Sequence, residues 1–273
     1  MLNKIRELNH KRIAARREKK NLLLFDNSFS RNTLNLEYLR LWIPKSYAIE
    51  NYVKKSKKLA IYSTFIGDSS IKTFSLKPAS NEFNHFFISN NNEILKLAKS
   101  LNWIPVFLPI ELSKNKVFCS SAAKIAKSLP HFFSFLKDYD YLLYVDDKIN
   151  FDLSKTLFTL AKNIDFTFLV RSHPSLKNNI LNELGEAMLQ KRYFVQLNQI
   201  TNYIDEKIRE GYLLTPKNLF WTSAILRNNR DDRVFIINED WYQNILICGI
   251  NCQISFDFIA QKYKSIIMSN DFI

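Results

Sequence analysis

Glycine and proline are scarce in this chain, which has four glycines and seven prolines in 273 residues. So few turn-forming residues argue against a β-sandwich, and no internal period indicates a solenoid. The three cysteines are too few and too irregularly spaced for a disulfide framework or a zinc site, so we expect Cys119, Cys248 and Cys252 to be reduced thiols. The chain also lacks any apolar run close to the roughly 20 residues that cross a bilayer.

Positive charge is abundant but uneven. The formal net charge is +13, and residues 1–20 hold eight Lys or Arg against two Glu, a net of +6, which leaves +7 for the rest of the chain. Apolar residues recur in this arm at roughly helical spacing, as in a basic amphipathic helix on an anionic membrane or on a partner. A solvated, lysine-rich helix fits the same residues. We predict a cytoplasmic protein, peripheral at the inner face of a membrane through residues 1–20, with no nucleic-acid partner because no recognised motif accompanies the charge.

Short apolar segments alternate with segments of helical periodicity. A hydrophobic content of 47% is enough for a substantial core. The alternation predicts an α/β sheet with helices on both faces. The expected strands are 58–65, 84–90, 103–109, 141–145, 165–173 and 218–228, and the expected helices are 92–102, 120–136, 153–163, 179–210, 238–250 and 253–263.

Two adjacent carboxylates follow one of the expected strands. The run 141–145 is short, β-prone and apolar, as in a strand buried on both faces, and it leads directly into Asp146 and Asp147. Ligands bind at the carboxyl edge of open α/β sheets. Oxygen ligands at that edge suit Mg²⁺ or Mn²⁺, which commonly bridge carboxylates to phosphates. The other interpretation is that the two aspartates begin a turn, where Asp is favoured.

Four segments together carry a resemblance to a known family. They are a lysine-containing helix with Pro130 and His131 that leads into DYDYLLYVDDKI (138–149), then RSHPSLKNNILNE (171–183), QITNYIDEKIREGYLLTPKNLFWTSAILRNN (199–229) and DWYQNILICGINCQISFDF (240–258). From about Lys58 to Tyr263, the chain resembles the glycosyltransferase-like family that includes plant turgor-regulation and mucilage proteins and bacterial capsule or lipopolysaccharide enzymes. That family is similar to nucleotide-diphospho-sugar transferases of the GT-A type.

The resemblance implies both a fold and an activity. It implies a GT-A-like (Rossmann-like) domain over 58–273, with a mixed, mostly parallel sheet flanked by helices, preceded by a basic helical arm and linker over 1–57. It also implies a glycosyltransferase that moves a sugar from a nucleotide-diphosphate donor to a glycan or lipid-linked acceptor in surface polysaccharide synthesis. A divalent cation, Mn²⁺ or Mg²⁺, would assist, with the nucleotide sugar as donor substrate.

Site residues follow from the matched positions. Asp146 and Asp147 are expected to hold the metal. The donor contacts expected are Asp146, Lys148, Lys124, Arg227 and Gln253, and the catalytic candidates are His173, Glu183 and Asp147. Each has a plainer interpretation: His173 as a hydrogen-bonded core histidine, Arg227 as a surface salt bridge, and Glu183 as a solvated residue on a helix.

The chain departs from the family pattern at two chemically important places. The sequence Asp146-Asp147-Lys148 stands where transferases of this type often have Asp-x-Asp, and Lys148 would replace part of the metal's charge. Cys252 stands where the family has an aspartate, and Glu239 would compensate, together with its neighbour Asp240, or else begin a helix. The lost aspartate favours an alternative, a non-catalytic relative that binds a glycan or a protein partner.

Overall fold

The computed structural model describes Phe25 and residues 34–68, 75–162, 165–176, 178–264, 267–269 and 271–272. The basic arm predicted over residues 1–20 lies outside these residues, as does Lys177 of the second matched segment.

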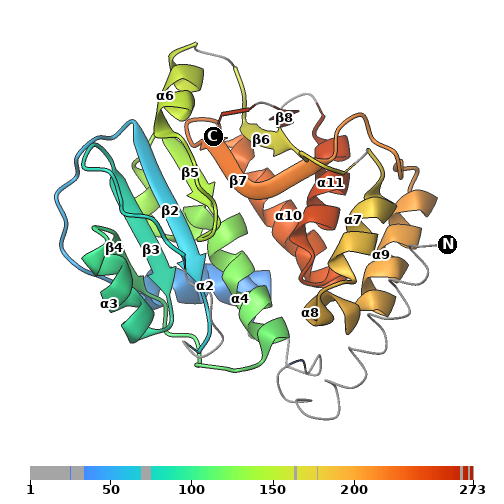
Figure 1. Cartoon of the computed structure of the whole chain (residues 1–273), viewed down its shortest axis with the longest axis horizontal. Helices are drawn as coiled ribbons and strands as arrows, with labels where there is room; N and C mark the ends of the chain where they lie inside the picture. The colour runs from blue at the N-terminus through green and yellow to red at the C-terminus, as the bar shows by residue number, and fades with distance from the viewer. Residues whose placement is uncertain are drawn as a thin grey trace.

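The described strands form one sheet. They are β1 (Ala48–Ile49), β2 (Leu59–Phe65), β3 (Asn84–Ser89), β4 (Ile104–Phe107), β5 (Tyr141–Val145), β6 (Phe168–Ser172), β7 (Phe220–Asn228) and β8 (Ile267–Ser269). Their order across the sheet is β1-β4-β3-β2-β5-β7-β6-β8 (Figure 1). Neighbours among β4, β3, β2 and β5 are parallel, and so are β6 and β8. β7 is antiparallel to β5 and β6, and β1 to β4, so the sheet is mixed.

Helices cover both faces of this sheet. They are α2 (Leu36–Ser46), α3 (Asn92–Ser100), α4 (Lys116–Ser128), α5 (Ser134–Lys137), α6 (Leu153–Ala161), α7 (Ile180–Ala187), α8 (Lys191–Phe194), α9 (Leu197–Arg209), α10 (Arg233–Cys248), α11 (Cys252–Lys262) and the 3₁₀ turn η4 (Pro130–Phe132). One core joins α2, α4, α10 and α11 to one face of the sheet. A second core joins α3 and α6 to the other face. The α/β fold class predicted from the sequence is therefore confirmed.

Strand alternation explains how the central strand serves both cores. In β5, Leu142 and Tyr144 point into the core that contains α4. Tyr141, Leu143 and Val145 point into the opposite core, because successive side chains of a strand face opposite ways. All five are buried, as expected for a strand covered on both faces.

Local chemistry fixes the ends of the two helices that bear on the site. Asn115 caps α4 by accepting hydrogen bonds from the backbone N–H groups of Val117 (3.0 Å) and Phe118 (3.3 Å). Asn251 caps α11 in the same way. Pro130 follows the end of α4, where a proline cannot continue the helical hydrogen bonds.

The structure corrects three boundaries. The helix expected over 120–136 begins at Lys116 and breaks at Pro130, and the one expected over 179–210 is three helices, α7, α8 and α9. Residues 34–57 were predicted as arm and linker, yet α2 buries Leu39 and Ile43 in the core, and β1 pairs with β4. The folded body thus includes these residues. Within the described residues, no helix combines the length and the apolar character needed to cross a membrane.

Candidate functional site

The carboxyl edge of β5 and β6 meets the beginning of β7. The Asp146 N–H donates to the carbonyl of Ser223 (2.8 Å), and the His173 N–H donates to the carbonyl of Leu219 (2.7 Å). These two acceptors are four residues apart, or roughly 13 Å along an extended chain. Asp146 and His173 therefore lie at two separate positions along this edge, with the first residues of β7 between them.

Asp146 is the centre of a group of charged residues at the first of these positions. Its Oδ1 accepts a hydrogen bond from the Tyr144 hydroxyl (2.6 Å) and lies 3.4 Å from Lys127 Nζ. Burial opposes ionisation of this carboxyl, but the charges of Lys127 and Lys124 outweigh it and hold the pKa of Asp146 below its ordinary value. Asp146 is therefore a carboxylate at neutral pH. Its side chain is 36% exposed, whereas that of Lys127 is only 3% exposed.

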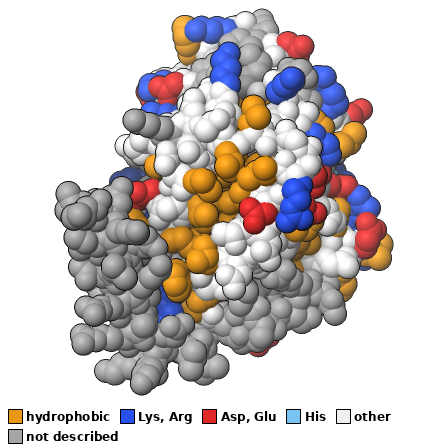
Figure 2. All heavy atoms as spheres, turned by 90° about the vertical axis from the view of Figure 1, so that its right-hand side faces the viewer, with side chains coloured by type: hydrophobic (Ala, Val, Ile, Leu, Met, Phe, Trp, Pro, Cys, Tyr) orange, Lys and Arg blue, Asp and Glu red, His pale blue; other side chains and the backbone are white. Residues whose placement is uncertain are grey.

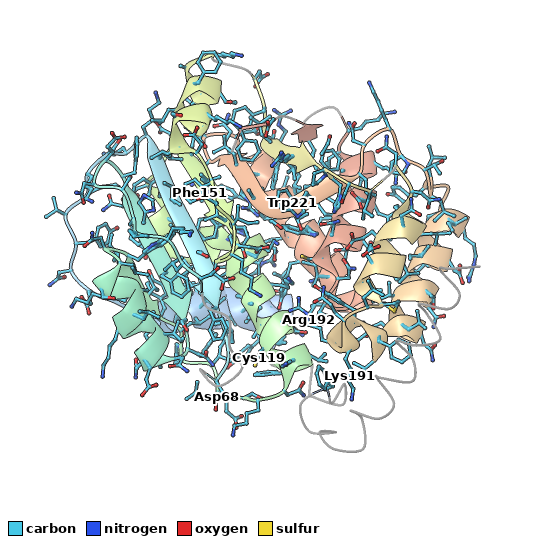
Figure 3. All side chains as sticks on the ribbon, viewed as in Figure 1. Asp68, Cys119, Phe151, Lys191, Arg192 and Trp221 are labelled. Atoms are coloured by element: carbon cyan, nitrogen blue, oxygen red, sulfur yellow. The ribbon has the colours of Figure 1, made fainter. Side chains whose placement is uncertain are left out.

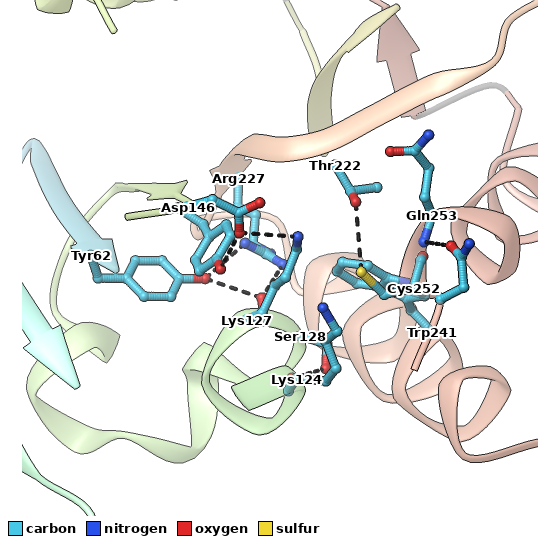
Figure 4. Close-up of polar contacts among 12 residues, drawn as sticks. Tyr62, Lys124, Lys127, Ser128, Asp146, Thr222, Arg227, Trp241, Cys252 and Gln253 are labelled. Carbon is cyan, nitrogen blue, oxygen red and sulfur yellow. Dashed lines mark hydrogen bonds and ion pairs between the residues drawn. The ribbon is translucent and has the colours of Figure 1, made fainter. Parts of the chain in front are cut away.

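Lys124 and Cys252 extend the group around Asp146 towards α11 (Figure 4). Burial lowers the pKa of the Lys124 ammonium, but the charges of nearby Cys252, Tyr193 and Asp146 raise it by more than burial lowers it. The net shift of this pKa is therefore upward. Burial raises the pKa of the Cys252 thiol, and the two lysines lower it below the ordinary value. The thiol lies 3.7 Å from the Thr222 hydroxyl on β7. Lys124, Lys127, Asp146, Thr222 and Cys252 form what we call the lysine cluster.

Arg227 lies beneath the lysine cluster. Its side chain is fully buried, and its guanidinium donates to Asn238 Oδ1 (2.9 Å), the Tyr62 hydroxyl (2.8 Å) and the Lys127 carbonyl (2.7 Å). Both alternatives considered for it, a donor-phosphate contact and a surface salt bridge, are therefore wrong. Its role is to hold the last turn of α4, and with it Lys127, against the sheet.

Glu183 on α7 is the centre of a separate polar group. It accepts hydrogen bonds from Gln253 Nε2 (2.6 Å) and Asn251 Nδ2 (3.2 Å), both at the start of α11. Burial raises the pKa of Glu183 to about 7, although the Asn251 hydrogen bond opposes the shift. The plain interpretation of Glu183 as a fully solvated residue is wrong. Gln253 was predicted to touch the donor, and here its amide group is bound to Glu183.

Asp257 adds a second carboxyl group below Glu183. It is almost completely buried, its Oδ1 accepts from the Phe220 N–H (2.9 Å), and its Oδ2 has no hydrogen-bond partner. Burial, with a further contribution from Glu183, raises the pKa of Asp257 well above its usual range. Asp257 ties α11 to the beginning of β7.

The remaining predicted residues lie at the borders of these two groups. His173 Nδ1 accepts from the N–H groups of Ser175 (3.3 Å) and Leu176 (3.0 Å), so its ring stabilises the turn after β6. Burial lowers the pKa of His173. Burial and the Asp146 charge raise the pKa of Asp147 to about 6, with Lys148 opposing. Lys148 itself is exposed. Glu239 and Asp240 do not compensate for Cys252, because they pair with Arg40 and Lys262.

The donor set around Asp146 does not fit a divalent cation well. No group of three or more His, Cys, Asp or Glu that could bind a metal occurs in the described part of the chain. Lys127 already lies 3.4 Å from Asp146 Oδ1. A Mg²⁺ bound to that oxygen at about 2.1 Å would lie within roughly 5.5 Å of the ammonium. The repulsion would be about 6 kcal/mol at an effective dielectric constant of about 20. Lys127 and the Tyr144 hydroxyl already contact Oδ1, so a metal at this oxygen would have to overcome that repulsion.

A cavity of about 450 Å³ lies elsewhere, between α2, the loop after β4 and α4. Its lining is largely apolar and aromatic and includes Tyr38, Trp42 and Phe118. Neither Asp146 nor Glu183 borders it. We assign the site to the sheet edge, because the charged and titratable groups that chemistry requires gather there and not in the cavity.

Sequence reasoning gave no site role to Lys127, Thr222, Cys252 or Asp257. Lys127 stands at i+3 from Lys124, a spacing that brings both to one helix face and could have identified it. Asp257 interrupts the apolar run ISFDFIA, and a carboxyl in a buried helix is itself an indication. Thr222 carries no sequence signal, because its position depends on how β7 pairs with β5.

Comparison with models of protein families gives no match, and comparison with curated proteins gives none either. Among solved structures, the chain is similar to mouse xyloside xylosyltransferase 1 in its apo form, with a TM-score of 0.46 and 11% identity over 78% of this chain and 85% of that one. It is similar to the apo WbbM bifunctional glycosyltransferase, with a TM-score of 0.44 and 11% identity over 81% of this chain and 40% of that one. A third similar structure is the mannosyltransferase Ktr4p from S. cerevisiae, with a TM-score of 0.39 and 12% identity over 86% of this chain and 79% of that one.

Proposed function

We propose that the chain is a glycosyltransferase that moves a sugar from a nucleotide-diphosphate donor to a glycan or lipid-linked acceptor in surface polysaccharide synthesis. The observation that carries the proposal is that the start of α11 borders both a cationic cluster, at Cys252, and a carboxyl group whose pKa is raised to about 7, at Asn251 and Gln253. Lys124 and Lys127 suit the diphosphate, and Glu183, whose pKa is raised to about 7, suits proton transfer.

In this scheme the acceptor hydroxyl forms a bond to the anomeric carbon of the donor sugar. The bond from that carbon to the phosphate oxygen breaks, and the nucleoside diphosphate leaves with the bonding electrons. Glu183 takes the hydroxyl proton, because a group with a pKa near 7 is well matched to general base catalysis at neutral pH. The lysine cluster stabilises the negative charge that develops on the leaving diphosphate.

Turnover of nucleotide sugars tests the proposal. The protein is incubated with a panel of sugars linked to uridine, guanosine and thymidine diphosphates, and release of free nucleoside diphosphate is measured with and without candidate acceptors. We expect release with at least one donor, and loss of release in Glu183→Gln with the protein still folded. Binding of a nucleoside diphosphate without release from any donor would instead support a non-catalytic relative, which Cys252 in place of an aspartate favours.

A further inference from the structure

We infer that this chain binds the diphosphate of its donor through the lysine cluster and without a divalent cation, with Lys124 as the direct phosphate contact. The inference rests on the proposed function and deepens it, because it states how the same site recognises its substrate. It also departs from the metal site that the sequence predicted at Asp146 and Asp147.

Asp146 already faces positive charge at its Oδ1. Lys127 Nζ lies 3.4 Å from Asp146 Oδ1, and the same oxygen accepts the Tyr144 hydroxyl at 2.6 Å. A cation bound to Oδ1 would compete with both neighbours for this oxygen. An anion, by contrast, needs only to approach the ammonium groups beside it.

Lys124 is available to a ligand. Among the described residues it has no ion pair and no side-chain hydrogen bond, and it stands one turn before Lys127, which is paired with Asp146. Lys124 keeps part of its surface exposed, whereas Lys127 is covered. Lys124 therefore contacts a phosphate directly, and Lys127 contributes its charge from beneath.

The surroundings of Lys124 continue the positive charge. Arg192 on α8 donates to Ser120 Oγ (3.1 Å), one helical turn before Lys124, and reaches α4 as Figure 3 shows. Cys252 opens α11, so the positive end of that helix dipole points to the same region (Figure 4). Arg227 holds the carbonyl of Lys127 and so keeps the cluster rigid.

Isothermal titration of nucleoside diphosphates tests this inference in buffer with EDTA and in buffer with Mn²⁺. We expect the affinity to be the same, within about twofold, in the two buffers, and Lys124→Met to weaken binding about tenfold or more in both. Lys96→Met, which removes an exposed helical lysine on α3, is the matched control and should leave the affinity unchanged.

Asp146→Asn separates the two models by the direction of its effect. If Asp146 binds a metal, the variant loses affinity in Mn²⁺. If Asp146 balances Lys127, the variant frees an ammonium and keeps or raises the affinity in EDTA, with a lower melting temperature. Diphosphate binding that needs Mn²⁺ and disappears in EDTA overturns the inference but leaves the proposed function intact. Absence of nucleoside diphosphate binding in both buffers overturns both.

Discussion

At the scale of single residues, the pKa of Glu183 has a consequence for activity. A base with a pKa of about 7 is protonated below that pH and cannot accept a proton. We expect kcat to rise with pH through about 7 and then to level off. Glu183→Gln should lower kcat by about 100-fold or more, in line with the usual contribution of a general base. A pH profile of kcat that is the same in the variant and the natural protein would exclude this role.

The same shift predicts how stability depends on pH. The folded state holds the Glu183 proton up to about pH 7, whereas the unfolded chain releases it near pH 4.5, so stability falls as the pH rises through this window. The loss from this residue is up to about 3 kcal/mol. Chemical denaturation at pH 4 and pH 8 measures it. The natural protein should lose more stability between the two values than Glu183→Gln, in which Asp257 still titrates; equal losses would contradict the raised pKa.

Cys252 offers a second test at this scale. In Cys252→Asp, a carboxylate replaces the thiol in the lysine cluster, next to Asp146. The new carboxylate adds an oxygen ligand for Mn²⁺ and offsets the charge of the two lysines. We expect Mn²⁺ to raise nucleoside diphosphate affinity at least about fivefold in this variant and not in the control Cys252→Ser. Titrations in which Mn²⁺ acts equally on both variants would show that residue 252 does not face the phosphate.

At the scale of elements, Asn251 joins two helices. Its Oδ1 caps α11 by accepting from the N–H groups of Gln253 and Ile254, both at 3.1 Å, and its Nδ2 donates to Glu183 on α7. Asn251→Ala removes the cap and that hydrogen bond, and should cost about 1–2 kcal/mol. Asn251→Asp is the matched control, because it keeps the cap but places a second negative charge beside Glu183.

Thermal melts and the pH profile of activity separate the two variants. Asn251→Ala should have a lower melting temperature than the natural protein at every pH. Asn251→Asp should have a melting temperature close to that of the natural protein at low pH. Its kcat should rise at a higher pH than that of the natural protein. If both variants melt alike and keep the natural pH profile, Asn251 neither caps α11 nor tunes Glu183.

Much of this organisation could be predicted at the level of elements. Strand β5 and helices α3, α6 and α11 lie close to their predicted ranges, because β5 is a short apolar run between aspartates and each helix begins just after a polar capping residue. Pro130 was inside the helix expected over 120–136, although a proline ends such a pattern. The burial of Arg227 could not be predicted, because it depends on Tyr62, which is 165 residues away in sequence.

At the scale of the whole molecule, we propose that the basic arm brings the protein to an anionic membrane. Residues 1–20 carry a net charge of +6. Hydrophobic side chains also form a band on the side that bears α7 and α9 (Figure 2), where exposed residues include Leu181, Leu189 and Ile208. The band is uncharged, so we expect the arm to account for any selectivity for anionic lipids.

Deleting residues 1–20 tests this. The truncated protein should lose binding to acidic liposomes and keep its nucleoside diphosphate affinity, because each basic residue near such a surface contributes about 1 kcal/mol. A full-length variant with the arm lysines changed to Gln is the control for deletion itself. Undiminished liposome binding by the truncated protein would assign the contact to the folded body instead.

The most direct test of the central claim is a crystal structure of the full chain with a nucleoside diphosphate, grown in EDTA. The account predicts the diphosphate at the carboxyl edge of β5, within hydrogen-bond distance of Lys124 Nζ and beside the start of α11, with Asp146 still paired to Lys127. A nucleotide bound instead in the cavity lined by Tyr38 and Trp42, or no bound nucleotide at saturating concentration, would contradict it.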